Sequence, residues 1–88
     1  MRKIVTSKTF DKKFVKLTSK NESLFKDIII TLELLSVDIN DSKLKTHKLV
    51  GNLKEFYASS INYSYRIIFQ YDNSSVYLET LGDHDEVY

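Results

Sequence analysis

The side chains best suited to chemistry are two histidines, one arginine within an apolar run, a lysine cluster and several tyrosines. His47 and His84 can exchange protons near neutral pH. Arg66 interrupts a strand-like run, residues 65–71, and its guanidinium group could hold a phosphate through two in-plane contacts. A tyrosine can stack on an exposed base or donate a proton. Such a set could cleave RNA at a 2′-hydroxyl, which needs a base, an acid for the 5′-oxygen and cations for the phosphate.

Each of these residues also has a plain structural interpretation. Arg66 could reach the edge of a sheet or extend to water, because burying an unpaired charge is costly. A lone histidine or tyrosine is most often at the surface or in packing. His47, His84 and Asp85 could supply metal ligands, but their spacing does not demand the three or four converging ligands of a metal site. No glycine-rich nucleotide loop, HExxH or GxSxG motif is present, so we predict neither a metal nor a cofactor.

The totals predict one small domain over residues 1–88. The chain has no cysteine, which fits a reducing cytoplasm and excludes disulfides. No apolar run approaches the roughly 20 residues of a membrane-spanning helix. Polar residues follow the first five at once, so a signal peptide is not expected. We therefore expect a cytoplasmic protein with no membrane partner.

Charge is distributed unevenly along the chain, although the net charge is only +1. Residues 1–20 contain seven Lys or Arg residues and one Asp, whereas residues 71–88 contain five Asp or Glu residues and no Lys or Arg. This asymmetry suits a protein that meets a polyanion or an acidic partner with one surface. A solvated, lysine-rich helix face would explain it equally well.

The first half of the chain predicts a strand and two helices. Residues 2–6 are typical of a short strand, and Ser7 or Thr9 can cap a following helix. A second helix, to about residue 36, starts either at a capping box formed by Ser19 and Glu22 or at Asn21. We expect the helical hairpin to bury five apolar residues against a sheet. They are Phe14, Leu17, Phe25, Ile28 and Leu32.

The second half predicts three strands. Residues 37–44 are polar and irregular, and residues 43–54 form a second basic stretch. Strands are then expected at 55–61, 65–71 and 76–81, and Gly82 ends the last of them. The order β-α-α-β-β-β predicts an α+β two-layer domain, with the helical hairpin on one face of a mainly antiparallel sheet. The first strand should pair at an edge or beside the last. The other face should stay partly open and carry any site.

Three segments resemble motifs of the RelE/ParE superfamily, the toxins of bacterial type II toxin–antitoxin systems. Residues 44–51 (LKTHKLVG) resemble its H-x-L-x-G segment. Residues 65–69 (YRIIF) resemble its arginine-containing strand, and residues 81–88 (LGDHDEVY) resemble its G-x-H-x-x-[VL]-[YF] ending. Order and spacing fit over essentially the whole chain. The sequence is most similar to the mRNA-interferase branch, which includes RelE, YafQ and YoeB.

This resemblance implies a ribosome-dependent, metal-independent endoribonuclease that cuts mRNA and is neutralised by a cognate antitoxin. Carried over to this chain, the catalytic residues would be His84, Arg66, His47 and Tyr88. The residues facing mRNA or ribosomal RNA would be Lys45, Lys48, Lys54 and Tyr65. The general base stays open, because the region between the second and third predicted strands offers only serines and tyrosines where YafQ-like toxins carry further polar candidates.

Two other functions remain as alternatives. The ParE branch shares the fold but poisons gyrase and lacks the catalytic set, so the two histidines, Arg66 and Tyr88 argue against it. A binding-only module with a degenerate site is the third possibility, and the low net charge is unusual for a protein that docks on ribosomal RNA.

Overall fold

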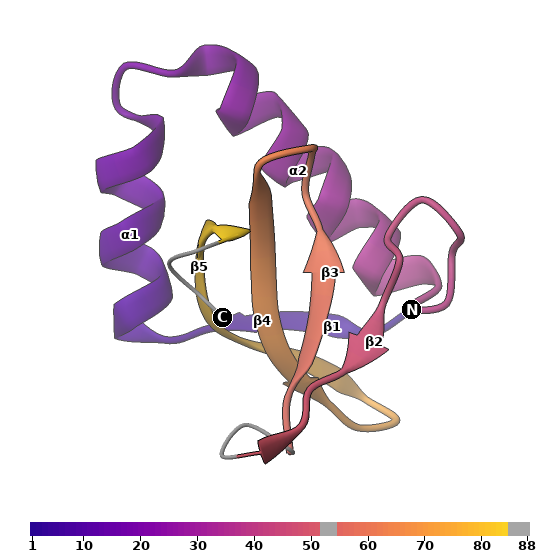
Figure 1. Cartoon of the computed structure of the whole chain (residues 1–88). Coiled ribbons are helices and arrows are strands. Elements are labelled where there is room, and N and C mark those ends of the chain that lie inside the picture. Colours follow the sequence, from indigo (N-terminus) through magenta and orange to yellow (C-terminus); the bar gives the residue numbers. More distant parts are fainter. Residues whose placement is uncertain (52–54, 85–88) are drawn as a thin grey trace.

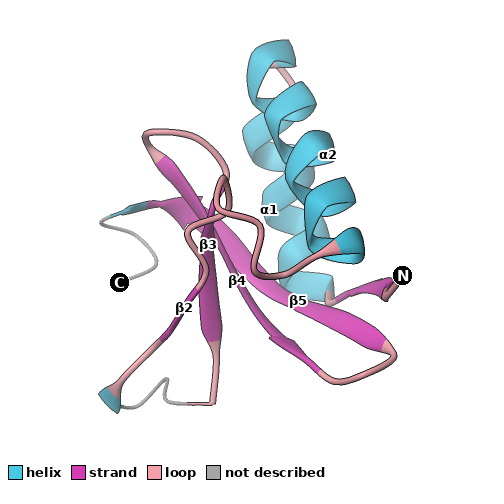
Figure 2. Cartoon of the chain, turned by 90° about the vertical axis from the view of Figure 1, so that its right-hand side faces the viewer, coloured by secondary structure: helices cyan, strands magenta, loops and turns pink. Residues whose placement is uncertain are grey.

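The computed structural model describes residues 1–51 and 55–84 and shows two helices packed on one face of a five-stranded sheet (Figures 1 and 2). The strand order is β1-β5-β4-β3-β2, with β1 parallel to β5 and the other pairs antiparallel. The elements are β1 (Lys3–Thr6), α1 (Lys8–Thr18), α2 (Glu22–Val37), β2 (His47–Lys48), β3 (Tyr57–Ser60), β4 (Tyr65–Tyr71) and β5 (Ser75–Asp83). The α+β two-layer fold and the edge position of the first strand are confirmed.

Side chains cap both helices at their first turns, where backbone N–H groups have no partner within the helix. Ser7 caps α1 by accepting a hydrogen bond from the Phe10 N–H at 3.0 Å, and Asn21 caps α2 by accepting from the Leu24 N–H at 3.0 Å. The alternative capping box at Ser19 is therefore wrong. Ser19 instead ends α1, where its own N–H bonds to the Val15 carbonyl at 3.0 Å.

Four of the five residues expected in the core do pack there. Ile28 is fully buried, and Phe14, Leu17 and Leu32 pack half-buried against the core cluster. Phe25 is the exception, because 42% of it is exposed. The buried stripe of α2 instead follows Leu24, Ile28, Thr31 and Leu35, which recur at helical spacing. Phe25 lies one position beside this stripe and packs on Phe14, with ring centroids 5.7 Å apart.

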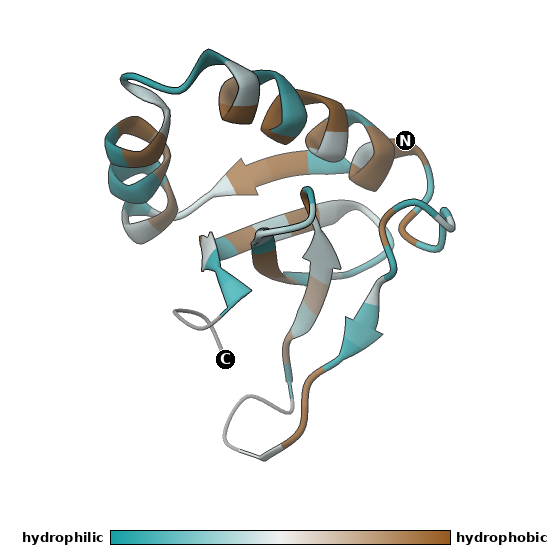
Figure 3. Cartoon of the chain, turned by 45° about the horizontal axis from the view of Figure 1, so that its top comes forward, coloured by the Kyte–Doolittle hydropathy of each residue, from teal (hydrophilic) through white to brown (hydrophobic). Residues whose placement is uncertain are grey.

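The core lies between the helices and the central strands. Figure 3 shows the hydrophobic part of β1 beneath the helices and a hydrophilic β2 at the far edge of the sheet. The sheet contributes five fully buried side chains of the core cluster. They are Ile67, Phe69, Val76, Leu78 and Leu81.

A bulge in β5 alters the pairing of the two central strands. Ile68 pairs with Thr80, but the next residue of β4, Phe69, pairs with Leu78, so Glu79 has no partner across the ladder. A bulge adds one residue and shifts which side chains face each way beyond it. The two arms of β5 can therefore both keep apolar residues toward the helices.

One strand was not predicted, and two in the second half of the chain differ in length from the prediction: β3 is shorter than residues 55–61, and β5 is longer than residues 76–81. β5 does not end before Gly82 but continues to Asp83, so that Gly82 pairs with Arg66 and Asp83 with Tyr65. The basic stretch contains a two-residue strand, β2, in which His47 pairs with Ala58. The extension of β5 and the presence of β2 arise from pairing with β4 and β3, which local residue types do not reveal.

Candidate functional site

Asn62 organises the turn between β3 and β4. Its side-chain oxygen accepts hydrogen bonds from the N–H groups of Ser64 and Tyr65, both at 2.9 Å. Its side-chain nitrogen donates to the Asp27 carboxylate on α2 at 3.1 Å. An asparagine that bonds backbone donors two and three residues on holds a turn in one conformation. The turn is thus fixed internally and tied to the helix layer.

Arg66 is half-buried on β4 beside this turn. Its Nη1 donates to the carbonyls of Asn62 at 2.9 Å, Tyr65 at 3.0 Å and, more weakly, Tyr63 at 3.4 Å. Within residues 1–51 and 55–84 it forms no ion pair, so no described carboxylate neutralises its charge. An uncompensated guanidinium group held on one side by carbonyls is well placed to attract a phosphate on the other.

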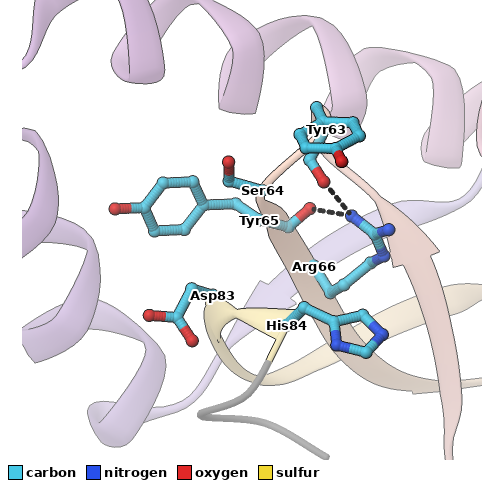
Figure 4. Close-up of a pocket in the computed structure, with 6 residues that line it drawn as sticks. All are labelled: Tyr63, Ser64, Tyr65, Arg66, Asp83 and His84. Carbon is cyan, nitrogen blue, oxygen red and sulfur yellow. Dashed lines mark hydrogen bonds between the residues drawn. The ribbon is translucent and has the colours of Figure 1, made fainter.

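His84 directly follows β5 and lies beside Arg66. Its backbone N–H donates to the Ser64 carbonyl at 3.0 Å, which joins the end of β5 to the turn. Figure 4 shows the imidazole on the same side of the sheet end as the guanidinium group. Both residues line an open pocket of about 590 Å³. The pocket is lined by Tyr63, Ser64, Tyr65, Arg66, Asp83 and His84.

Strand alternation explains which side chains face which way at this end of the sheet. Neighbouring residues of a strand point to opposite faces. Tyr65 and Asp83 are paired across the ladder, and Figure 4 shows both side chains directed away from Arg66 and His84. The ring of Tyr65 packs half-buried against the hydrophobic core. The structure therefore does not bring Tyr65 together with Arg66 and His84, although it borders the same pocket.

His47 lies on the same face of the sheet as Arg66 but two strands away. It pairs with Ala58, which pairs with Ile68, two residues beyond Arg66 on β4. Strand spacings place the Cα atoms of His47 and Arg66 about 12 Å apart. An exposed substrate strand would have to cross this face to touch both residues. His47 is oriented by a contact of 3.2 Å between its Nδ1 and the carbonyl oxygen of Lys45.

Two of the three lysines expected to face RNA lie within the described residues. Lys45 and Lys48 are exposed, and Lys45 has a positive φ of 51°, which is uncommon for a residue with a side chain. Lys48 follows His47 on β2, so it points to the opposite face. Lys54 and the expected catalytic residue Tyr88 lie outside the described residues.

Asn62 was not predicted to contribute to this site, and Tyr63 was counted only among the tyrosines between the second and third predicted strands, with no role of its own. Tyr63 forms part of the pocket wall, and Asn62 positions both the turn and Arg66. The Asn-Tyr-Ser segment between two strands indicates a turn, but its link to Asp27 joins positions 35 residues apart and has no local signal. Within residues 1–51 and 55–84, no group of three His, Cys, Asp or Glu side chains could hold a metal ion. None of the described helices is long and apolar enough to cross a membrane.

A family model described as the bacterial toxin YafQ of type II toxin–antitoxin systems matches residues 2–88. The chain belongs to this toxin family. The expectation drawn from the three motifs is thereby confirmed for the family. No curated protein sequence matches the chain.

Solved structures of several bacterial toxins share the fold over nearly the full length. E. coli YafQ is 20% identical, with coverage of 100% of this chain and 99% of that chain and a TM-score of 0.82. A metal-bound toxin from Helicobacter pylori is 28% identical, with 100% of both chains covered and a TM-score of 0.82. YafQ in the E. coli DinJ–YafQ toxin–antitoxin complex is 21% identical, with 99% and 97% covered and a TM-score of 0.79.

Proposed function

We propose that this YafQ-family toxin is an endoribonuclease that cleaves mRNA on the ribosome. The observation that carries the proposal is the shared pocket of Arg66, whose charge no described carboxylate neutralises, and His84. One side chain suits a phosphate and the other suits proton transfer. Their convergence at the end of two paired strands follows from the fold itself, because the antiparallel β4–β5 pair sets the start of one strand beside the end of the other.

The chemistry assigned to the pocket is an attack of a ribose 2′-oxygen on the adjacent phosphorus. The new O–P bond closes a 2′,3′-cyclic phosphate, and the bond to the 5′-oxygen of the next nucleotide breaks. In this proposal His84 gives its proton to the departing 5′-oxygen, and Arg66 offsets the charge that grows on the phosphate oxygens. No cofactor takes part in these steps.

His47 is the described residue that we assign as the base for the 2′-hydroxyl proton. His47 shares the face of Arg66, and its side chain is oriented by the Lys45 carbonyl. A general base acts through hydrogen-bond contact with the proton that it removes. With His47 in this role, the RNA strand extends from the pocket across β3. Tyr88, the other candidate, lies outside the described residues.

Exposed basic side chains on two other elements suit docking on mRNA and ribosomal RNA. Lys8, Lys12 and Lys16 are exposed at helical spacing along α1, and Lys45 and Lys48 are exposed near β2. Phosphate contacts of this kind give affinity without sequence specificity and weaken with salt. The toxin acts in the cytoplasm, where its ribosomal substrate is found.

An antitoxin protein is the second proposed partner. The complex of E. coli DinJ with YafQ supports this assignment, since that toxin has the same fold. In our proposal the antitoxin covers the pocket or the face that leads to it. A neutralised complex in which Arg66 and His84 stay accessible to solvent would argue against direct occlusion.

The test is a cleavage assay with purified protein. mRNA on translating ribosomes should be cut, the cut should disappear when the antitoxin is added, and gyrase supercoiling should be unaffected. Inhibition of supercoiling without any mRNA cut would instead assign the chain to the gyrase-poisoning function. A protein inactive in both assays would support a binding-only module.

A further inference from the structure

Tyr63 is the most exposed aromatic residue of the described chain, with 96% of its surface open to solvent. Aromatic side chains usually bury much of their large apolar surface in the core or in an interface. Tyr63 does neither within the described residues, although it lies at the rim of the pocket that holds Arg66 and His84. The exposed ring therefore needs an explanation that a core role does not supply.

The backbone that carries Tyr63 is firmly held. Asn62, immediately before it, bonds the N–H groups of Ser64 and Tyr65 and the carboxylate of Asp27. The Tyr63 carbonyl accepts from the Arg66 guanidinium group at 3.4 Å. A tyrosine has only two side-chain torsions, so a ring on a fixed turn loses little conformational entropy when it binds a partner.

The position of the ring relative to Arg66 indicates its partner. Figure 4 shows Tyr63 and Arg66 next to one another on the same side of the turn, with His84 below them. A phosphate held by the guanidinium group carries a nucleotide on each side. An aromatic ring at the rim of such a pocket can stack on a neighbouring base, and stacking tolerates any base because every base has a π-face.

We propose that Tyr63 is a nucleotide-binding residue that stacks on an unpaired base adjoining the phosphate held by Arg66. This inference rests on the proposed function for the choice of RNA as ligand. It moves the stacking role from Tyr65, whose ring packs against the core, to a tyrosine that faces solvent beside the pocket. Tyr63 thereby positions the strand for cleavage and takes no part in proton transfer.

The experiment measures binding without cleavage. Ribosomes are programmed with mRNA whose vacant A-site codon carries 2′-O-methyl groups, which removes the attacking hydroxyl. Each codon position is tested with its base present and as an abasic nucleotide. The proteins compared are wild type, Tyr63→Phe, Tyr63→Ala and, as a matched control, Tyr77→Ala, which removes another exposed tyrosine at the far end of β5.

Wild type should bind the intact codon more tightly than one abasic codon by about 5- to 150-fold, the range expected for one stacked base. Tyr63→Phe and Tyr77→Ala should keep this preference. Tyr63→Ala should bind both RNAs with the affinity that wild type shows for the abasic one, because the two changes remove the same contact.

Three results would overturn the inference. They are a wild-type protein indifferent to all three abasic positions, a Tyr63→Ala variant that keeps the preference, and a variant that loses only antitoxin affinity, which would assign the ring to the protein partner. The proposed function is judged separately on unmethylated mRNA. If wild type prefers the intact codon but never cuts mRNA, the proposed nuclease function is wrong and the stacking role of Tyr63 stands.

Discussion

Arg66 combines contacts that hold a turn with a charge that we propose to act on a phosphate. One nitrogen of its guanidinium group bonds the carbonyls of the β3–β4 turn, while the charge as a whole is offset by no described carboxylate. The turn supplies the orientation that a phosphate ligand requires.

Substitution of Arg66 should separate these two contributions. We expect Arg66→Ala to lower the single-turnover rate of mRNA cleavage by about 10²- to 10³-fold, because it removes a preorganised charge. Ribosome affinity should change less than the rate. Arg66→Lys should recover part of the rate, since it restores the charge but not the planar fork.

Asn62→Ala is the matched control for this experiment, because it loosens the same turn and leaves the charge in place. The loss caused by Arg66→Ala should exceed that caused by Asn62→Ala. Equal losses in the two variants would show that Arg66 acts only by holding the turn.

At the scale of the elements, the site depends on helices that fix the sheet from one side. Ile28 on α2 is fully buried in the core, whereas Ile30, two residues later, is 56% exposed. Ile28→Ala should lower the free energy of unfolding by about 2–5 kcal/mol, because it leaves a cavity. Ile30→Ala should change it by no more than about 0.5 kcal/mol. Urea unfolding measures both, and similar values for the two variants would contradict the packing described.

The hairpin between β4 and β5 is held by the carboxylate of Asp72. This carboxylate accepts hydrogen bonds from the N–H groups of Ser74 and Ser75, each at 2.8 Å, and from the Tyr77 hydroxyl at 2.9 Å. These bonds, the backbone ones first, lower the pKa of the Asp72 carboxyl group below its usual value. Since the folded pKa lies below the unfolded one, the carboxylate stabilises the fold above about pH 3.9. That stabilisation is lost as the pH falls through the folded pKa.

Asp72→Asn removes this titration with little change in shape. The difference in urea midpoint between wild type and the variant should be present at neutral pH and should close as the pH falls below about 3.9. A difference that stays constant down to acidic pH would show that the carboxylate charge does not stabilise the hairpin.

Features set by residues close together in the sequence were predictable, whereas features set by pairing between distant segments were not. Helix α2 was predictable because apolar residues recur every three to four positions, and so was the β4–β5 meander that joins Arg66 to His84. Strand β2 was not predicted, because two exposed residues carry no alternating pattern and form a strand only by pairing with β3. Tyr63 and Tyr65 are two positions apart, and an alternating pattern would give both the same face. They differ because Tyr63 lies in the turn, whereas Tyr65 begins β4 and packs against the core.

At the scale of the whole molecule, topology places the site where several segments end. The start of β4, the end of β5 and the β3–β4 turn meet at one end of the sheet, and the Asn62–Asp27 bond ties this end to α2. The helices cover one face of the sheet (Figure 2). Arg66 alternates along β4 with Tyr65 and Ile67, which pack against the core, so its side chain lies on the other face. The core therefore supports the pocket that Arg66 and His84 line.

The most direct test of this account asks whether His84 protonates the leaving oxygen. Wild type and His84→Ala are compared in single-turnover cleavage on ribosomes carrying either normal mRNA or mRNA with sulfur in place of the scissile 5′-oxygen. A thiolate is a far weaker base than an alkoxide and departs without a proton. Asp72→Asn, at the far end of the sheet, serves as the control for general effects of substitution.

We predict that His84→Ala cuts normal mRNA about 10²- to 10⁴-fold more slowly than wild type, the typical cost of losing a general acid. On the sulfur-containing mRNA its rate should approach that of wild type. A His84→Ala protein that cuts normal mRNA within about threefold of wild type, far less than the loss of a general acid costs, or that is equally slow on both RNAs, would contradict the assignment of His84 as the acid.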